Sequence, residues 1–463
     1  MNTKKLKYLY HLDSLRAIAV LLVLLFHLDV DFLQGGFIGV DVFFVISGFL
    51  ITRILSHEFT VTGKINFMNF YLKRIRRLIP TLFLILVITS ILSFFIFSPS
   101  DFIKAIKSVF MSSIAISNFH FLGESGYFDS SSSFKPLLHT WSLGIEEQFY
   151  LLYPAFLYIL MRLIKQKKML ITVLFILLSI SLFFNIYTSK SGISENISNL
   201  FLTEGDLASG VASLQFYLLP FRIFEFMIGA IIAFIPKMKI KSEFVKINIS
   251  LIAFLIIIIS SIYLSKNTEY LSTMMVLPCI ATGLLLYFEP SKKLSFIFSN
   301  KALIYLGKIS YTLYIVHWVL IVSIKYIYGS ELSLLDKTIL FSTTIILSST
   351  IYHFYELPIR YKKSFLPLKS NKILVSILVV FVAGFSFLSH KVNAENGWLW
   401  RLDKDSMKFT KIIKNPKNFH KNNWGGADYK IGGWISKDIN ADPDIFLMGD
   451  SHAGHLKYGL DHI

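Results

Sequence analysis

Two ionisable residues lie eleven positions apart in the first apolar stretch of this 463-residue chain, Arg16 and His27. At roughly 100° per residue, that spacing returns a helix to nearly the same face, and the rise between the two is ~16 Å. A neutral histidine can accept a proton, and a guanidinium group can hold an anion. Ionisable groups within a membrane are costly and usually mark a functional site. The alternative is that Arg16 is a topology anchor and His27 an interfacial cap.

A second basic motif precedes another apolar stretch. Arg74 and Arg77 flank Ile75 and Arg76, shortly before Pro80, which suits the first turn of a helix. Such a run at a membrane boundary often contacts lipid headgroups. It is equally what a phosphate-rich donor such as coenzyme A would require, because guanidinium groups bind phosphates bidentately.

Carboxylates accompany these basic groups. Glu146 and Glu147 begin another apolar stretch, and adjacent helical residues lie about 100° apart, so at most one of the two can face a shared cavity. They are candidate functional carboxylates, although both could lie at headgroup level beside an aromatic belt. Asp41 lies in the block from 39 to 51 and could be solvated. Glu356 could pair with Arg360.

A second histidine, His317, falls inside a later apolar stretch. Taken alone, a histidine in this position is more often an interhelical hydrogen-bonding residue than a catalyst.

Composition identifies a polytopic membrane protein, since 54% of the residues are hydrophobic and only 16% are charged. The net charge of +17 does not indicate nucleic-acid binding, because the basic residues fall in short loops between apolar stretches. A single cysteine, Cys279, excludes a disulfide framework or a cysteine metal cluster, and we expect no metal.

Eleven candidate spans can be placed along the chain. They cover approximately residues 15–33, 36–52, 79–98, 140–161, 169–187, 220–235, 246–264, 271–288, 302–327, 334–354 and 372–390. Lysine and arginine are concentrated in one alternate set of loops, which predicts a cytoplasmic N-terminus. An odd number of spans would then carry residues 391–463 to the extracytoplasmic side.

The ordered set of motifs resembles the acyltransferase family 3 membrane proteins over residues 8–362. The matching blocks are Arg16 to His27, 39–51, Arg74 to Arg77, 141–150, 307–318 and 354–360. The resemblance implies a bacterial inner-membrane O-acyltransferase, usually an O-acetyltransferase, that modifies a surface polysaccharide such as O-antigen or lipooligosaccharide. It also implies that Arg16 and His27 are the essential pair, and that the arginines at 74 and 77 form the second basic motif.

The tail carries a separate resemblance. A predicted short strand from residue 444 leads into Gly-Asp-Ser-His, which looks like the nucleophile block of the SGNH hydrolases, with Ser451 as the nucleophile. The glycine, asparagine and Asp-x-x-His that complete this fold do not follow Ser451 within the sequence. A serine without its base is a weak nucleophile, so we expect an incomplete catalyst here.

These features predict an all-α polytopic membrane protein with about ten transmembrane helices and an eleventh linking helix, followed by an incomplete α/β SGNH-like segment. The predicted parts are a transmembrane domain at 8–362, a linker with the eleventh helix at 363–390, and an extracytoplasmic part at 391–463.

In the mechanism that the resemblance implies, cytoplasmic acetyl-CoA is held by Arg16, Arg74 and Arg77. His27 acts as general base or transient acyl acceptor, and the acyl group leaves toward a polysaccharide or lipid-linked sugar. Two rival interpretations are a transporter or flippase of a lipid-linked sugar or acyl donor, and a membrane-tethered esterase. The acceptor, the acyl chain length and the oligomeric state stay open.

Overall fold

A computed structural model describes residues 8–124, 134–190, 213–238, 240–265, 275–329, 331–361 and 370–402, with the backbone of 429–430 and 433–434. The chain divides into two units, Met1–Gly397 and Trp398–Ile463. In the second unit the described residues form a short 3₁₀ helix, Leu399–Arg401, and a two-stranded antiparallel pairing of β1 (Tyr429–Lys430) with β2 (Gly433–Trp434). The predicted strand from 444 and Ser451 lie outside the described residues.

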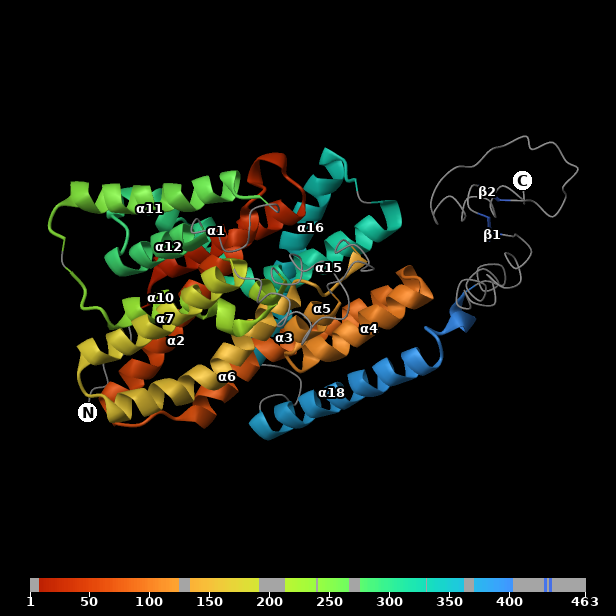
Figure 1. The fold of residues 1–463 in the computed structure, drawn as a ribbon, viewed down its shortest axis with the longest axis horizontal. Helices are drawn as coiled ribbons and strands as arrows, with labels where there is room; N and C mark the ends of the chain where they lie inside the picture. The colour runs from red at the N-terminus through yellow and green to blue at the C-terminus, as the bar shows by residue number, and fades with distance from the viewer. Residues whose placement is uncertain are drawn as a thin grey trace, which may run out of the picture. The chain divides into compact units, whose positions relative to one another are not determined.

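The first unit is built from helices (Figure 1). The long ones are α1 (Tyr10–His27), α2 (Gly39–Thr62), α3 (Phe67–Ile96), α4 (Pro99–Ser113), α6 (Thr140–Leu163), α7 (Lys167–Lys190), α10 (Leu219–Phe234), α11 (Glu243–Tyr263), α12 (Val276–Phe288), α15 (Ser310–Tyr328), α16 (Leu334–Ile351) and α18 (Asn371–Ala394). Shorter ones are α5 (Ser117–Gly123), α13 (Ser295–Phe298), α14 (Lys301–Lys308), the π-helix Tyr352–Glu356 and α17 (Leu357–Arg360). The described residues of the first unit therefore form an all-α bundle, as the sequence predicts.

Eight helices of the described chain are long and apolar enough to cross a membrane. They are α1, α2 with its preceding turn, α3, α7, α11, α15, α16 through α17, and α18. The described residues of the remaining expected spans also contain helices, but α10 and α12 have only 16 and 13 residues, and α6 carries two glutamates near its start. The chain is thus an integral membrane protein, while the count of eleven stays a prediction.

Several predicted boundaries are wrong for local reasons. The first helix ends at His27 rather than near 33, because Asp29 adopts a positive φ of 50° that an α-helix does not tolerate. The expected single span 302–327 is broken at Ile309 into α14 and α15. Pro80 lies inside α3, whose start is capped by the side chain of Asn66, so the second arginine motif is part of that helix.

Close backbone contacts hold the bundle together. A Cβ atom added at Gly48 of α2 would collide with the carbonyl oxygen of Phe226, and one at Gly229 of α10 with that of Val45. Glycine allows helices in a membrane to approach this closely, and α2 and α10 lie side by side (Figure 1). Gly307 of α14 meets the backbone of Asp13 in the same way, which places α14 against α1.

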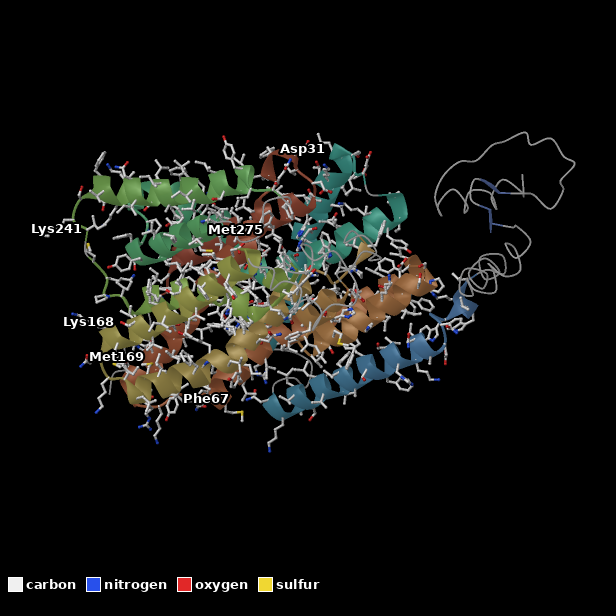
Figure 2. All side chains as sticks on the ribbon, viewed as in Figure 1. Asp31, Phe67, Lys168, Met169, Lys241 and Met275 are labelled. Atoms are coloured by element: carbon white, nitrogen blue, oxygen red, sulfur yellow. The ribbon has the colours of Figure 1, made fainter. Side chains whose placement is uncertain are left out.

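The ends of the helices agree with the expected loop charges. Figure 2 shows Lys168, near the start of α7, and Lys241, just before α11, projecting at the same end of the bundle. Both belong to the loops that the sequence places on the cytoplasmic side. The orientation itself stays a prediction.

Candidate functional site

A cavity inside the bundle collects residues from α1, α2, α3, α6 and α15. It holds about 790 Å³ of empty space, part of it open to solvent, and its polar lining comes from five of the six blocks that the sequence singled out. The polar side chains that line it are Arg16, Ser47, Arg74, Arg77, Ser142, Glu146, Tyr150, Ser310, Tyr311 and Tyr314. The structure therefore brings together the predicted Arg16, the arginine pair of α3 and one of the two predicted carboxylates.

Three guanidinium groups face this cavity with few partners. Arg16 lies 3.8 Å from Asp13, one turn earlier on α1. Among the described residues, Arg74 and Arg77 make no ion pair, and the buried Nε atom of each lacks a hydrogen-bond acceptor. Arg74 instead stacks on the ring of Tyr150, 3.2 Å from its centroid. A buried cation without a counterion is costly, so this arrangement suits an anionic ligand.

The intervening arginine of the motif points elsewhere. Arg76 donates to the side chain of Asn371 at 2.8 Å and to the carbonyl of Ile359 at 3.2 Å. Residues three apart share a helix face, whereas the residue between them does not. The spacing of Arg74 and Arg77 thus places both on the cavity side of α3, and Arg76 ties that helix to α17 and α18.

The two adjacent glutamates separate as their spacing predicts. Glu146 faces the cavity and accepts hydrogen bonds from Ser47 of α2 and Tyr150 of α6. Glu147 lines a smaller cavity with hydroxyl residues of α4 and α5. Tyr311 contributes to the walls of both cavities. Only Glu146 is therefore in a position to act on a ligand of the arginine cavity.

His27 does not line the arginine cavity. Its ring packs on Trp318, with centroids 4.4 Å apart, and its Nδ1 atom lies 3.0 Å from Nε2 of His317. Tyr314 connects this histidine pair to the cavity, because it lines the cavity wall and its ring centroid is 5.4 Å from that of His317. The ~16 Å rise between Arg16 and His27 therefore leads from the arginine end to the histidine end.

A third histidine completes this end of the site. His139, in the turn before α6, has its ring centroid 5.5 Å from that of His317, and its carbonyl accepts a hydrogen bond from Tyr314. Burial lowers the pKa of His139 well below its usual value. The sequence reasoning missed this residue, which carries no recognisable spacing signal.

A buried ionic cluster was also missed. Arg222 of α10 donates through Nη1 to Asp41 at 2.8 Å and to Glu225 at 2.6 Å, and all three side chains are almost completely buried. The expectation that Asp41 is solvated is wrong, because α10 covers it. The sequence did carry a signal for this cluster, because Arg222 and Glu225 lie three positions apart within the apolar stretch 220–235.

Two minor predictions can be checked in the same region. Glu356 lies 3.9 Å from Arg360, as predicted, and also accepts a hydrogen bond from Thr312 at 2.6 Å. His317 is the interhelical hydrogen-bonding residue that its position indicated. No group of three or more His, Cys, Asp or Glu side chains among the described residues could hold a metal ion.

Comparison with known proteins gives a consistent result. The family model described as "Acyltransferase domain", acyltransferase family 3, matches residues 9–353. The O-acetyltransferase OatA of Staphylococcus aureus (strain MRSA252) is 31% identical over 397 residues, which cover 81% of this chain and 62% of OatA. A protein of the same strain, provisionally named an O-acetyltransferase, is 30% identical over 401 residues, 81% of this chain and 63% of its own length.

The chain thus spans a little over three fifths of the length of these relatives. No solved structure is significantly similar to it.

Proposed function

Because this chain belongs to acyltransferase family 3, whose model covers residues 9–353, we propose that it is a membrane O-acetyltransferase. In this proposal, acetyl-CoA enters from the cytoplasmic side, and the acetyl group is passed to a hydroxyl of a cell-surface polysaccharide or a lipid-linked sugar. The observation that carries the proposal is the convergence of Arg16, Arg74 and Arg77 on one cavity, where the latter two have no anionic partner among the described residues.

The donor fits this arrangement by charge and by length. Guanidinium groups bind phosphates strongly, and coenzyme A carries its phosphates at one end and its thioester at the other. With the phosphates near Arg16, Arg74 and Arg77, the extended arm of the donor would follow the wall toward Tyr314. The thioester would then approach the histidine end, about 16 Å further along α1.

His27 supplies the chemical step in this proposal. As general base it removes the proton from the acceptor hydroxyl, whose oxygen attacks the thioester carbonyl, and the C–S bond breaks as the C–O bond forms. The proton then passes from His27 to the departing sulfur. In the alternative sequence, His27 first accepts the acetyl group itself and then releases it to the hydroxyl.

Other residues have supporting roles. Glu146 orients Ser47 and Tyr150 at the cavity wall, and Tyr150 in turn carries the guanidinium of Arg74. Ser451 would be the nucleophile of an extracytoplasmic segment that passes the acetyl group onward. That role requires a histidine base to activate the serine.

The relatives support an acetyl group and an oxygen acceptor, because they are named as O-acetyltransferases. We propose a bacterial surface polysaccharide, with the protein in the inner membrane and its N-terminus in the cytoplasm.

The test uses a bacterial host that lacks surface acetylation of its own. Ester-linked acetate on extracted polysaccharide should appear with the wild-type chain and be absent with His27→Ala. The control is His390→Ala, since His390 lies on the exposed side of α18, far along the chain from the site. Acetate that persists in His27→Ala would refute the assigned role of His27.

A second measurement separates donor binding from the acceptor. The purified chain in lipid nanodiscs should bind coenzyme A, and Arg74→Gln combined with Arg77→Gln should abolish that binding. A transporter or flippase of a lipid-linked sugar predicts no coenzyme A binding at all.

A further inference from the structure

The geometry of the histidine pair determines which nitrogen atom of His27 can react. His27 Nδ1 and His317 Nε2 are 3.0 Å apart, and the two rings stack with centroids 5.2 Å apart and planes inclined by 21°. His317 is fully buried on α15. On its other side, its Nδ1 atom lies 3.3 Å from the carbonyl oxygen of Leu313, one turn earlier.

The carbonyl determines the proton positions in this chain of hydrogen bonds. A carbonyl oxygen only accepts, so Nδ1 of His317 must carry hydrogen. In a neutral ring, Nε2 of His317 is then an acceptor, and the hydrogen between the two rings belongs to Nδ1 of His27. Consequently the lone pair of a neutral His27 is on Nε2.

A doubly protonated His317 is the only other state in which its Nδ1 atom donates to the carbonyl of Leu313. It would place a cation where the described residues offer His317 no carboxylate, and an unpaired buried charge is strongly unfavourable. The residues whose rings face His317, namely His27, His139 and Tyr314, do not provide a negative charge. The neutral arrangement is therefore the stable one.

We propose that His317 is a positioning residue that holds His27 in the Nδ1–H form and so presents Nε2 as the reacting atom. This inference rests on the proposed function for its catalytic meaning. Nε2 of His27 takes the hydroxyl proton as the C–O bond forms and the C–S bond breaks, and it then gives that proton to the sulfur. His317 exchanges no proton; it accepts the Nδ1–H hydrogen bond, which strengthens while the ring of His27 is positively charged.

This arrangement parallels the role of the carboxylate in a serine-protease triad, which orients its histidine and selects the tautomer. Here a neutral imidazole performs the same task. A neutral acceptor suits an apolar bundle, because a buried carboxylate would carry a larger desolvation cost.

The tautomer can be observed without donor or acceptor. The full chain is labelled with ¹⁵N-histidine, reconstituted in lipid bilayers and studied by solid-state NMR, in which protonated and unprotonated ring nitrogens resonate far apart. The chain has 12 histidines, so the His27 signals are assigned by their loss in His27→Ala. We expect Nδ1 of His27 to be protonated and Nε2 to be unprotonated.

Three variants test the cause. His317→Leu removes the acceptor, and the His27 signals should shift to the Nε2–H form that histidine favours in solution. His317→Gln keeps an acceptor oxygen in the place of Nε2 and should preserve the wild-type pattern. His139→Gln alters a ring that faces His317 but leaves both partners of the His27–His317 hydrogen bond in place, and it should also preserve the pattern.

An Nε2–H signal for His27 in the wild-type chain would overturn the proposal, and so would an unchanged His27 tautomer in His317→Leu. Activity gives a second readout. His317→Leu should lower kcat by roughly 100-fold or more and leave KM for acetyl-CoA unchanged. His317→Gln should restore part of the lost kcat. Because the NMR result needs no turnover, failure of the proposed function would leave the tautomer measurement intact.

Discussion

The buried cluster of Arg222, Asp41 and Glu225 allows a quantitative test of how this bundle accommodates charge. Both carboxylates accept from the same guanidinium nitrogen, at 2.8 and 2.6 Å. At an effective dielectric constant of about 20, a pair 2.8 Å apart attracts with roughly 6 kcal/mol, and each buried ion costs several kcal/mol in desolvation. One guanidinium thus neutralises only one of two carboxylates that lie close together.

The shared guanidinium predicts an order of effects. Arg222→Met leaves two buried carboxyl groups without a counterion and should lower the free energy of unfolding by at least about 3–5 kcal/mol. Asp41→Asn keeps an acceptor for Nη1 and leaves Glu225 as the carboxylate paired with Arg222. We expect a loss of about 1 kcal/mol for this variant.

The assay is equilibrium unfolding in mixed micelles by a denaturing detergent, followed by tryptophan fluorescence. Trp141 is a suitable reporter, because its ring lies 5.2 Å from the guanidinium carbon of Arg222. The control is Lys237→Met, which breaks the ion pair with Glu289, where both side chains are well exposed. An exposed pair should contribute less than about 1 kcal/mol. The reasoning is refuted if Asp41→Asn is as destabilising as Arg222→Met, or if Arg222→Met matches the control.

Three further predictions concern the site and the packing around it. Arg77→Gln should raise KM for acetyl-CoA by roughly 10- to 100-fold, because it removes a charge-assisted contact of about 1.5–3 kcal/mol. Since Arg76 faces away from the cavity, Arg76→Gln should leave KM unchanged in the same kinetic assay. Gly307→Val should lower the unfolding free energy by about 1–3 kcal/mol or more and reduce membrane expression, since its side chain would collide with the backbone of α1; normal stability would contradict the close contact. Glu146→Gln should tighten coenzyme A binding by roughly fivefold, about 1 kcal/mol, by removing a negative charge from the cavity, while Glu147→Gln, which lines the other cavity, should not change the Kd measured by calorimetry.

The sequence alone was sufficient for the helical membrane class and for several residues that line the candidate cavity. Apolar stretches of membrane length identify a helical membrane protein, because an unsatisfied backbone in lipid is prohibitively costly. Helical periodicity also separates Arg74 and Arg77 from Arg76, and Glu146 from Glu147, since the angle between successive residues is a local property of the helix.

Local breaks were harder to predict. The end of α1 at His27 and the break at Ile309 depend on local backbone conformations, such as the positive φ of Asp29, that the pattern of residue types does not predict. Likewise, the residues around Asp41 do not indicate that α10 covers it and provides Arg222 as its partner.

Spacing along the chain therefore determined that Arg16 and His27 lie on one helix, about 16 Å apart, and that the arginines at 74 and 77 share a face. Only the tertiary structure decided what each residue meets. It joined the two arginine motifs in one cavity and brought His317, 290 positions away, to His27. The physical reason is that helix geometry follows from neighbouring residues, whereas contacts between helices depend on how small residues such as Gly48 and Gly307 let the backbones approach.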